Sequence, residues 1–384
     1  MKNPYPPLFP TQLLSASNEV RVQYFRNCRV EHFNQQECFR QTMSAINSAC
    51  GPRIVQVVGP TGAGKSNLAL KIYQALLEQY RNLIESDPGA VPVAILDAVA
   101  PNGTSFNWKD FYVRLLEKHG DVLLKRKMLL PRQHDLFEGH AAPLPLERST
   151  TEALRRTAEK ALKNRKTKVL IIDEGHHILM VNDPKRLEFQ FEALKSLTIE
   201  SDLVIVLVGT YKLLAIRDQS GQLVRRSEIV HFRRYNLRQT EDQQHFLEAL
   251  IELQQQLPLP TMPNLRAKAR YYFLKSGGSI GMLKDWLSRC LEHALLRGMH
   301  TFDHIFAEEF ALSNKSLITI LDEAIEGEIA LEDASIDKVK ALLYRVATKA
   351  NSVAAQPPAK KKSAKAVGKR KPSRDKTGEE YGGK

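Results

Sequence analysis

One run of eight residues restricts the fold of this chain more than any other feature of the sequence. Residues 59–66, Gly-Pro-Thr-Gly-Ala-Gly-Lys-Ser, match the phosphate-binding loop pattern G-x-x-x-x-G-K-[ST] at every defined position. Residues 53–58 form an apolar run rich in β-branched side chains, which predicts a buried strand before the loop. Apolar residues recur at helical spacing over 68–76, which predicts a helix after it.

The chemistry of this loop predicts a nucleoside triphosphate as its ligand. Small residues leave backbone N–H groups free to surround the phosphates, and the helix N-terminus adds favourable partial charge. Lys65 can reach the β and γ oxygens, and the Ser66 hydroxyl can ligate Mg²⁺. We therefore predict ATP and Mg²⁺ as cofactors, with a nucleotide site made of Gly59, Pro60, Thr61, Gly62, Ala63, Gly64, Lys65, Ser66 and Asn67.

A second apolar run, residues 169–172, ends in two carboxylates. A buried strand here would deliver Asp173 to the edge of an open α/β sheet where ligands bind. Asp173 is then expected to hold Mg²⁺ through water, opposite Ser66. Glu174 is expected to orient and deprotonate the attacking water. The pair predicts an enzyme that hydrolyses ATP to ADP and phosphate.

Two further positions complete the predicted hydrolase. Thr210 follows the apolar run 203–208, and its hydroxyl can sense the γ-phosphate or the attacking water, with a helix cap as a compatible alternative. Arg225 and Arg226 precede the last predicted strand. An arginine that reaches a neighbouring subunit's γ-phosphate stabilises the charge of the transfer, although exposed arginines without such a role are common. Catalysis in trans would require an oligomer.

Histidine and cysteine give no strong metal signal. His176 and His177 follow the paired acids, but no matching ligand set appears elsewhere, so we favour orienting or packing roles for them. The four cysteines form neither a C-x-x-C pair nor a disulfide framework. Reduced thiols in a cytoplasmic protein are the favoured interpretation, and a zinc site on the first three is the alternative. These cysteines are Cys28, Cys38, Cys50 and Cys290.

The chain length of 384 residues allows two or three domains. No apolar run approaches the roughly 20 residues that cross a bilayer, so we predict a cytoplasmic protein without a membrane partner. The net charge is +13, and residues 351–384 carry 10 Lys and Arg against 3 Asp and Glu, a net of +7. This tail has few large apolar side chains and is expected to be a disordered tether for phosphate backbones, or only a solubilising segment.

The pattern along the chain predicts an α/β fold with a mainly parallel sheet flanked by helices, because strand and helix patterns alternate. After residue 237 the pattern is helical only, which indicates a small lid. The predicted divisions are an N-terminal extension over 1–50, the α/β nucleotide-binding domain over 51–238, the lid over 239–315, an acidic helical connector over 316–350 and the basic tail over 351–384.

The order of these motifs resembles the AAA+ ATPases, and more narrowly the TnsC/TniB regulators of transposition. The narrower resemblance rests on residues 173–177, on Gly209-Thr210, on Gln222-Leu223-x-x-Arg226 and on 278–283 in the lid. It implies that Thr210 is sensor 1 and that Arg226 is the more favoured arginine finger. Many relatives place an arginine at the start of the lid helix as sensor 2. This chain has Lys284 there, and we expect Lys284 to take its place at the nucleotide, although lysine lacks the planar fork of arginine.

The resemblance implies an ATP-dependent regulator that forms a ring or helical filament around duplex DNA. It would link a target-selector protein to a transposase and disassemble on hydrolysis. Contacts to the DNA backbone would carry little base specificity, with candidates in 102–109 and in 125–127. The alternatives are a helicase loader or replication initiator of the AAA+ class, and a nucleotide-switched scaffold that does not bind DNA.

Overall fold

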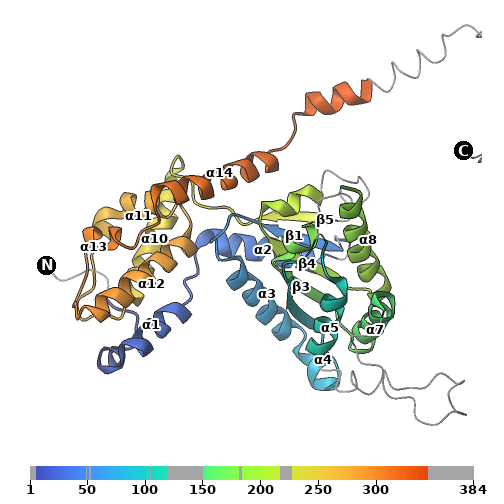
Figure 1. Ribbon diagram of the computed structural model, residues 1–384, viewed down its shortest axis with the longest axis horizontal. Coiled ribbons are helices and arrows are strands. Elements are labelled where there is room, and N and C mark those ends of the chain that lie inside the picture. Colours follow the sequence, from blue (N-terminus) through green and yellow to red (C-terminus); the bar gives the residue numbers. More distant parts are fainter. Residues whose placement is uncertain are drawn as a thin grey trace, which may run out of the picture. The chain divides into compact units, whose positions relative to one another are not determined.

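The structure is a computed structural model of the chain (Figure 1). It describes residues 6–48, 50–51, 53–101, 103, 105–119, 150–180, 184–216 and 227–344. Chain contacts group residues 1–331 into one unit and 332–384 into a second. In the second unit, residues 336–344 form an exposed helix. No helix within the described ranges combines the length and apolar character needed to cross a bilayer.

A five-stranded sheet forms the centre of the first unit, in the order β2-β3-β4-β1-β5. All strand pairs are parallel, with Val58 opposite Gly209 and Asp97 opposite Asp173. The carboxyl ends of the strands therefore meet at one edge. The strands are β1 (Ile54–Val58), β2 (Val93–Asp97), β3 (Val169–Asp173), β4 (Val204–Gly209) and β5 (Ser227–His231).

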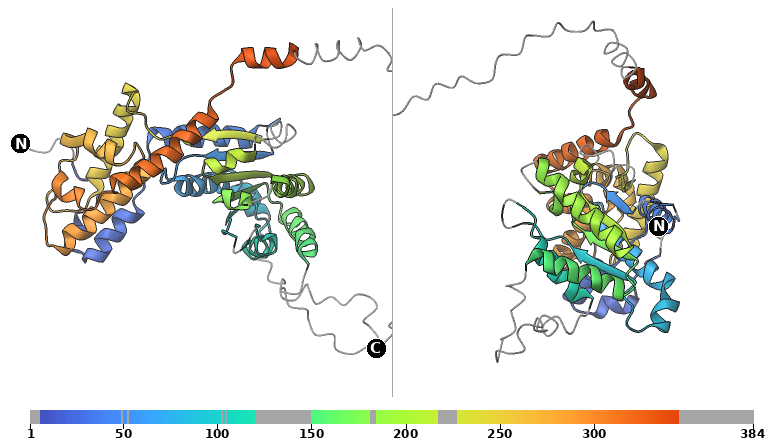
Figure 2. Two further views of the ribbon diagram at one scale, coloured as in Figure 1. Left: turned by 45° about the horizontal axis from the view of Figure 1, so that its top comes forward. Right: turned by 90° about the vertical axis from the view of Figure 1, so that its right-hand side faces the viewer.

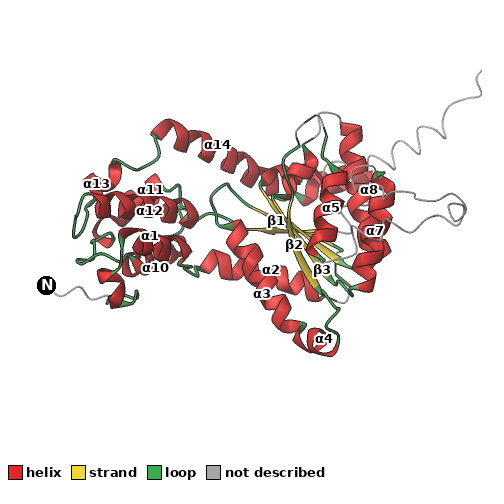
Figure 3. Ribbon diagram, turned by 60° about the horizontal axis from the view of Figure 1, so that its bottom comes forward, coloured by secondary structure: helices red, strands yellow, loops and turns green. Residues whose placement is uncertain are grey.

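Helices cover both faces of this sheet (Figure 3). Alternate strand residues face opposite sides, so Val169 and Ile171 pack against one helical layer while Leu170 and Ile172 pack against the other. Sheets buried on both faces need apolar residues at successive positions, which β3 provides. The first layer holds α2 (Phe33–Asn47) and α3 (Lys65–Gln79), and the second holds α5 (Trp108–Lys118), α7 (Thr151–Asn164) and α8 (Pro184–Ser201). The short helix α4 (Arg81–Ser86) follows α3 and buries none of its residues.

A separate apolar cluster forms the helical lid, with Trp286 and Leu287 fully buried at its centre. Helix α1 (Asn18–Asn27) belongs to this cluster through Val22 and Phe25, and it lies beside α12 in Figures 1 and 2. The N-terminal extension is thus divided, with α1 on the lid and α2 on the sheet. The lid helices are α10 (Thr240–Gln256), α11 (Ala269–Lys275), α12 (Ile280–Leu296) and α13 (His304–Glu308).

Helix α14 (Asn314–Leu331) differs from the expected solvated connector, because it packs on the nucleotide-binding domain. It lies against η5 (Tyr211–Ile216), where Ala324 enters the main core and Gly327 sits against the Tyr211 ring. Arg234 forms two hydrogen bonds to the Glu328 carboxylate, at 2.8 and 2.9 Å. Asp322, Glu323 and Glu326 are exposed, whereas the face of α14 that packs on the domain consists of small and apolar residues.

The α/β class, the parallel sheet and the helical lid are confirmed. The strands predicted from residues 53–58, 169–172 and 203–208 are present, with ends that differ by one residue from those expected. Several predictions concern residues outside the described ranges. These are Arg225 and Arg226, residues 125–127 and the tail 351–384.

Candidate functional site

The phosphate-binding loop lies between the end of β1 and the start of α3, as its sequence predicts. Gly62 and Gly64 have φ values of 79° and 93°, in the left-handed region that favours glycine. Gly59 is required for a different reason, since an added Cβ would lie 2.4 Å from the Phe232 carbonyl oxygen. The loop therefore keeps the tight backbone path that exposes its N–H groups to a phosphate.

Lys65 is the first residue of α3, and its side chain folds back over the loop. The ammonium donates hydrogen bonds to the carbonyls of Gly59 at 3.2 Å and Pro60 at 2.8 Å. Burial lowers the pKa of Lys65, while the nearby carboxylates of Glu174 and Asp173 raise it. The positive charge is thus held within the loop, where the phosphates of a nucleotide would bind.

Ser66 and Asp173 meet at the carboxyl edge of the sheet. The Ser66 hydroxyl lies beside the Asp173 carboxylate and lowers its pKa, and the same carboxylate accepts the Glu174 backbone N–H at 2.8 Å. Burial nevertheless raises the pKa of Asp173, and the charges of Glu174 and Asp97 add to this effect. A hydroxyl and a buried carboxylate are oxygen ligands that suit Mg²⁺. The pair fits the predicted magnesium position.

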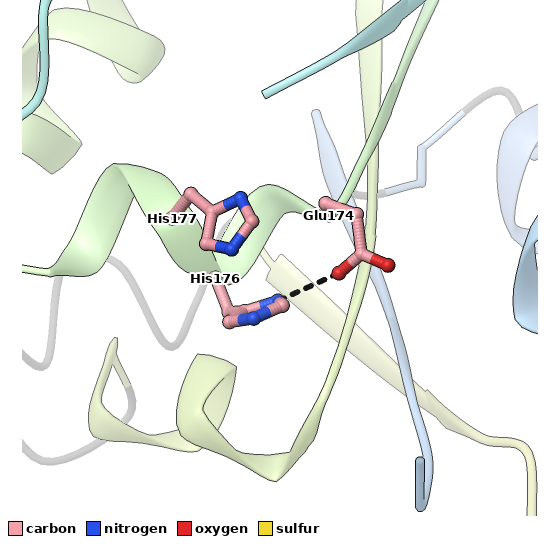
Figure 4. Close-up of side chains that lie close together, drawn as sticks. All are labelled: Glu174, His176 and His177. Carbon is pink, nitrogen blue, oxygen red and sulfur yellow. Dashed lines mark ion pairs between the residues drawn. The ribbon is translucent and has the colours of Figure 1, made fainter. Parts of the chain in front are cut away.

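Glu174 has an unusual backbone conformation, with a φ of 51°. The left-handed region costs a residue with a side chain about 1–2 kcal/mol, so it tends to occur where function requires it. The turn carries the chain from β3 into η4 (Gly175–Leu179), which brings His176 beside the carboxylate. Glu174 Oε2 lies 3.3 Å from His176 Nδ1, as Figure 4 shows.

A cavity of about 490 Å³ joins these groups. Two buried polar atoms on its wall, Thr210 Oγ1 and His176 Nδ1, have no hydrogen-bond partner among the residues that the structure describes. The 3.3 Å contact of His176 Nδ1 with Glu174 does not have the geometry of a hydrogen bond. Burial lowers the pKa of His176 to about 4, with nearby positive charges adding to the effect. The wall includes Thr61, Gly62, Gly64, Lys65, Ser66, Asn67, Glu174, His176 and Thr210.

The lid and the N-terminal helix form the other wall of this cavity. Lys284 lies there, as expected for a sensor-2 position, but its ammonium donates to the carbonyls of Arg26 at 2.9 Å and of Cys28. Lys284 therefore holds α1 against α12. Arg26 itself lines the cavity, with its guanidinium 2.7 Å from the Glu292 carboxylate. Sequence analysis missed Arg26, since no motif links it to the loop.

Contact between the lid and the loop is direct. Ser279, the N-cap of α12, donates its hydroxyl to the Gly62 carbonyl at 2.8 Å. The backbone of Gly281 lies so close that an added Cβ would be 1.9 Å from the same oxygen. Because the loop and α12 touch through backbone atoms, a change in the position of one acts on the other.

Residues 50–216 match the family model of the AAA domain. The chain is similar in structure to the ORC2 protein of Aeropyrum pernix, with 13% identity, a TM-score of 0.45 and coverage of 81% of this chain and 71% of that one. It is also similar to a Walker-type ATPase of Pyrococcus abyssi, with 14% identity, a TM-score of 0.43 and coverage of 80% of this chain and 78% of that one. The similarity to the Drosophila ORC bound to DNA has 12% identity, a TM-score of 0.46 and coverage of 91% of this chain and 87% of that one. No curated protein matches the sequence.

Residues 50–216 are thus similar to the AAA domain, and the sheet and its flanking helices have the AAA+ P-loop NTPase fold. Within this fold, the structure brings Lys65, Ser66, Asp173, Glu174 and Thr210 together at one edge of the sheet.

Proposed function

We propose that this protein is an ATPase that assembles on duplex DNA when ATP is bound, leaves the DNA after hydrolysis, and regulates DNA transposition. One observation carries the ATPase part of the proposal. Lys65, Ser66 and Glu174 share one cavity, and Asp173 lies beside Ser66 at its edge. A charge for the phosphates, a pair of oxygen ligands and a carboxylate base are the groups that hydrolysis of a triphosphate requires.

Each group has a defined part in this proposal. The loop N–H groups and Lys65 bind and orient the phosphates. A bound Mg²⁺, held by Ser66 and Asp173, would neutralise charge on the β and γ oxygens. Glu174 accepts the proton of the attacking water, and the unpartnered Thr210 hydroxyl orients that water or the γ-phosphate.

The DNA part of the proposal is supported by charge. Lysine and arginine exceed aspartate and glutamate by 13 over the chain, and half of this excess lies in the last 34 residues. Contacts from such residues to phosphates release counterions, so affinity for DNA would fall steeply between about 50 and 200 mM salt. Equal affinity at both salt concentrations would instead favour the nucleotide-switched scaffold that does not act on DNA.

Mass photometry tests the assembly. The full-length protein with ATP and non-specific duplex DNA is expected to form oligomers, and the Lys65→Ala variant is expected to remain monomeric because it cannot hold the triphosphate. Monomers alone under all conditions would contradict the proposal. Mixing Arg226→Ala with Lys65→Ala subunits tests the arginine finger, since a finger that acts in trans should change turnover according to the mixing ratio.

The transposition part rests on the motif resemblance, and a pulldown with ATP tests it. Recovery of a transposase or a target-selector protein would support it. Recovery of a replicative helicase would replace it with the helicase-loader or initiator alternative, while leaving the ATPase proposal in place.

A further inference from the structure

We propose that Glu174, His176 and His177 form a binding site for a transition-metal dication, with Zn²⁺ as the best match, distinct from the magnesium position at Ser66 and Asp173. One potential ligand atom from each of the three side chains lies within 4.8 Å of the others. Figure 4 shows the two imidazoles one above the other beside the carboxylate. Among the described residues, this is the one group of three potential metal ligands whose ligand atoms all lie this close together.

The spacing already fits one pair of ligands. In a tetrahedral zinc site with bonds of about 2.0–2.1 Å, neighbouring ligand atoms are about 3.3 Å apart. His176 Nδ1 and Glu174 Oε2 are 3.3 Å apart without making a hydrogen bond to each other. The third ligand atom, on His177, lies within 4.8 Å of these two, so a small shift of this side chain would complete the site. The centroid of the His177 ring lies 4.4 Å from that of His176.

Each imidazole has a ring nitrogen that is available to bind a metal. His177 Nδ1 lies 2.8 Å from the Ala98 carbonyl oxygen, which can only accept, so Nδ1 carries the proton and Nε2 keeps its lone pair. A backbone carbonyl in this role is the usual support of a metal-binding histidine. His176 is only 8% exposed, and its Nδ1 has no hydrogen-bond partner in the structure. A bound cation would satisfy this buried atom.

The backbone holds the three residues together. The left-handed Glu174 turns the chain from β3 into η4, so ligands from one short segment face one another. Gly209 at the end of β4 leaves room for the His176 ring, since a Cβ there would lie 3.3 Å from Nδ1. The supporting Ala98 carbonyl follows β2, so three neighbouring strands fix the arrangement.

Donor chemistry and charge separate this site from the magnesium position. Two imidazole nitrogens and one carboxylate suit Zn²⁺, whereas Mg²⁺ prefers the oxygens of Ser66 and Asp173. Lys65 and Lys212 place positive charge near His176 and oppose a cation. The carboxylates of Asp173 and Glu174 offset these two charges, so the dication does not enter a positive field.

Occupation of this site would withdraw the Glu174 carboxylate from the attacking water. Binding of the metal does not depend on the proposed function, but this consequence rests on it. Zn²⁺ is thus expected to inhibit ATP hydrolysis when it occupies this site.

Metal binding is tested on the nucleotide-free, full-length protein, so that its result is independent of ATPase activity. A Cys50→Ser background removes an exposed thiol that would bind the same metals. Affinity for Zn²⁺ is measured by chelator competition, and visible absorption of Co²⁺ reports the geometry. The variants are His176→Gln and His177→Gln, and His300→Gln on the exposed surface of the lid is the matched control.

The expected result is one Zn²⁺ per chain, a tetrahedral Co²⁺ spectrum, and an affinity that falls at least about tenfold in both cluster variants but not in the control. Unchanged affinity in His177→Gln, with its circular dichroism spectrum intact, would overturn the proposal, as would an octahedral Co²⁺ spectrum. If the metal binds but hydrolysis is insensitive to Zn²⁺, the inhibitory consequence is wrong and the site stands.

Discussion

The hydroxyl of Ser279 donates a hydrogen bond of 2.8 Å to the carbonyl of Gly62, and so joins the lid to the phosphate-binding loop across 217 positions of sequence. Ser279 is also the N-cap of α12, because its hydroxyl accepts the Met282 backbone N–H. One side chain therefore fixes both the start of the lid helix and its distance from the loop. A nucleotide that moves the loop would move the lid with it.

Gly281→Ala tests this connection. The added Cβ would lie 1.9 Å from the Gly62 oxygen and 3.2 Å from the Gly64 nitrogen, both backbone atoms, so the loop and α12 must separate. Overpacking of this kind costs about 1–3 kcal/mol, which corresponds to roughly 5- to 150-fold in ATP affinity if the loop carries the cost. Calorimetric titration with ATP measures it.

The matched control is Gly298→Ala, at the other end of the same helix, where an added Cβ meets no atom within 4 Å. Its positive φ of 64° costs some stability but does not act on the loop. Equal ATP affinity in the two variants would mean that the lid contact does not matter for binding.

Much of the sheet could be predicted from the sequence, because its strands are buried on both faces and therefore read as continuous apolar runs. Residues 169–172 are an example, since the two carboxylates after them mark the point where β3 reaches solvent. The loop and its glycines could be predicted for a similar reason, as few other residues tolerate their backbone conformation.

Other parts could not be predicted because their signal lies between distant positions. Arg26 reaches the cavity only because Val22 and Phe25 attach α1 to the lid. The packing of α14 depends on Ala324 and Gly327, and small residues among acids give no hydrophobic period. The proximity of Glu174 to His176 and His177 could not be predicted either, because it depends on the left-handed backbone conformation of Glu174.

Glu174→Gln is expected to separate binding from hydrolysis. The amide keeps the shape of the side chain but cannot take a proton from water, so turnover should fall by about a hundredfold or more while ATP affinity changes little. Oligomers of the variant on DNA should persist longer than those of the wild type, because we propose that hydrolysis causes their disassembly. Phosphate release and mass photometry check the two effects, with Glu188→Gln on the exposed surface of α8 as the control. Retained hydrolysis would remove Glu174 from its role as base.

Gly327→Ala tests the docking of α14. In an unobstructed helix this change stabilises by about 1 kcal/mol. Here the new Cβ would lie 2.1 Å from the Tyr211 ring, whose hydroxyl is fixed 2.8 Å from His231 Nε2. We expect the free energy of unfolding to fall by about 1–3 kcal/mol and hydrogen exchange to increase in α14.

Gly103→Ala is the control for this experiment, since its added Cβ has open space around it. A gain in stability for Gly327→Ala would show that α14 does not rest on Tyr211 in solution. The sign of the change in the free energy of unfolding distinguishes the two cases, because helix propensity predicts an increase and packing against Tyr211 predicts a decrease.

Acid should destabilise the fold through His32, which is 8% exposed and lies 3.0 Å from the Tyr235 hydroxyl through its Nδ1. Burial lowers the pKa of His32 to about 4, below the value of about 6.5 in an unfolded chain. Between these pH values the unfolded state binds more protons than the folded state. The contribution of His32 to the free energy of unfolding is therefore complete above pH 6.5 and is lost as the pH falls towards 4, by at most about 1.4 kcal/mol per pH unit.

Denaturant unfolding of the wild type and of His32→Asn tests this pH dependence, and the variant should show the shallower loss of stability between about pH 6.5 and pH 5. The exposed His300→Asn variant should keep the wild-type slope, and equal slopes in all three proteins would show that His32 has the same pKa in the folded and unfolded states.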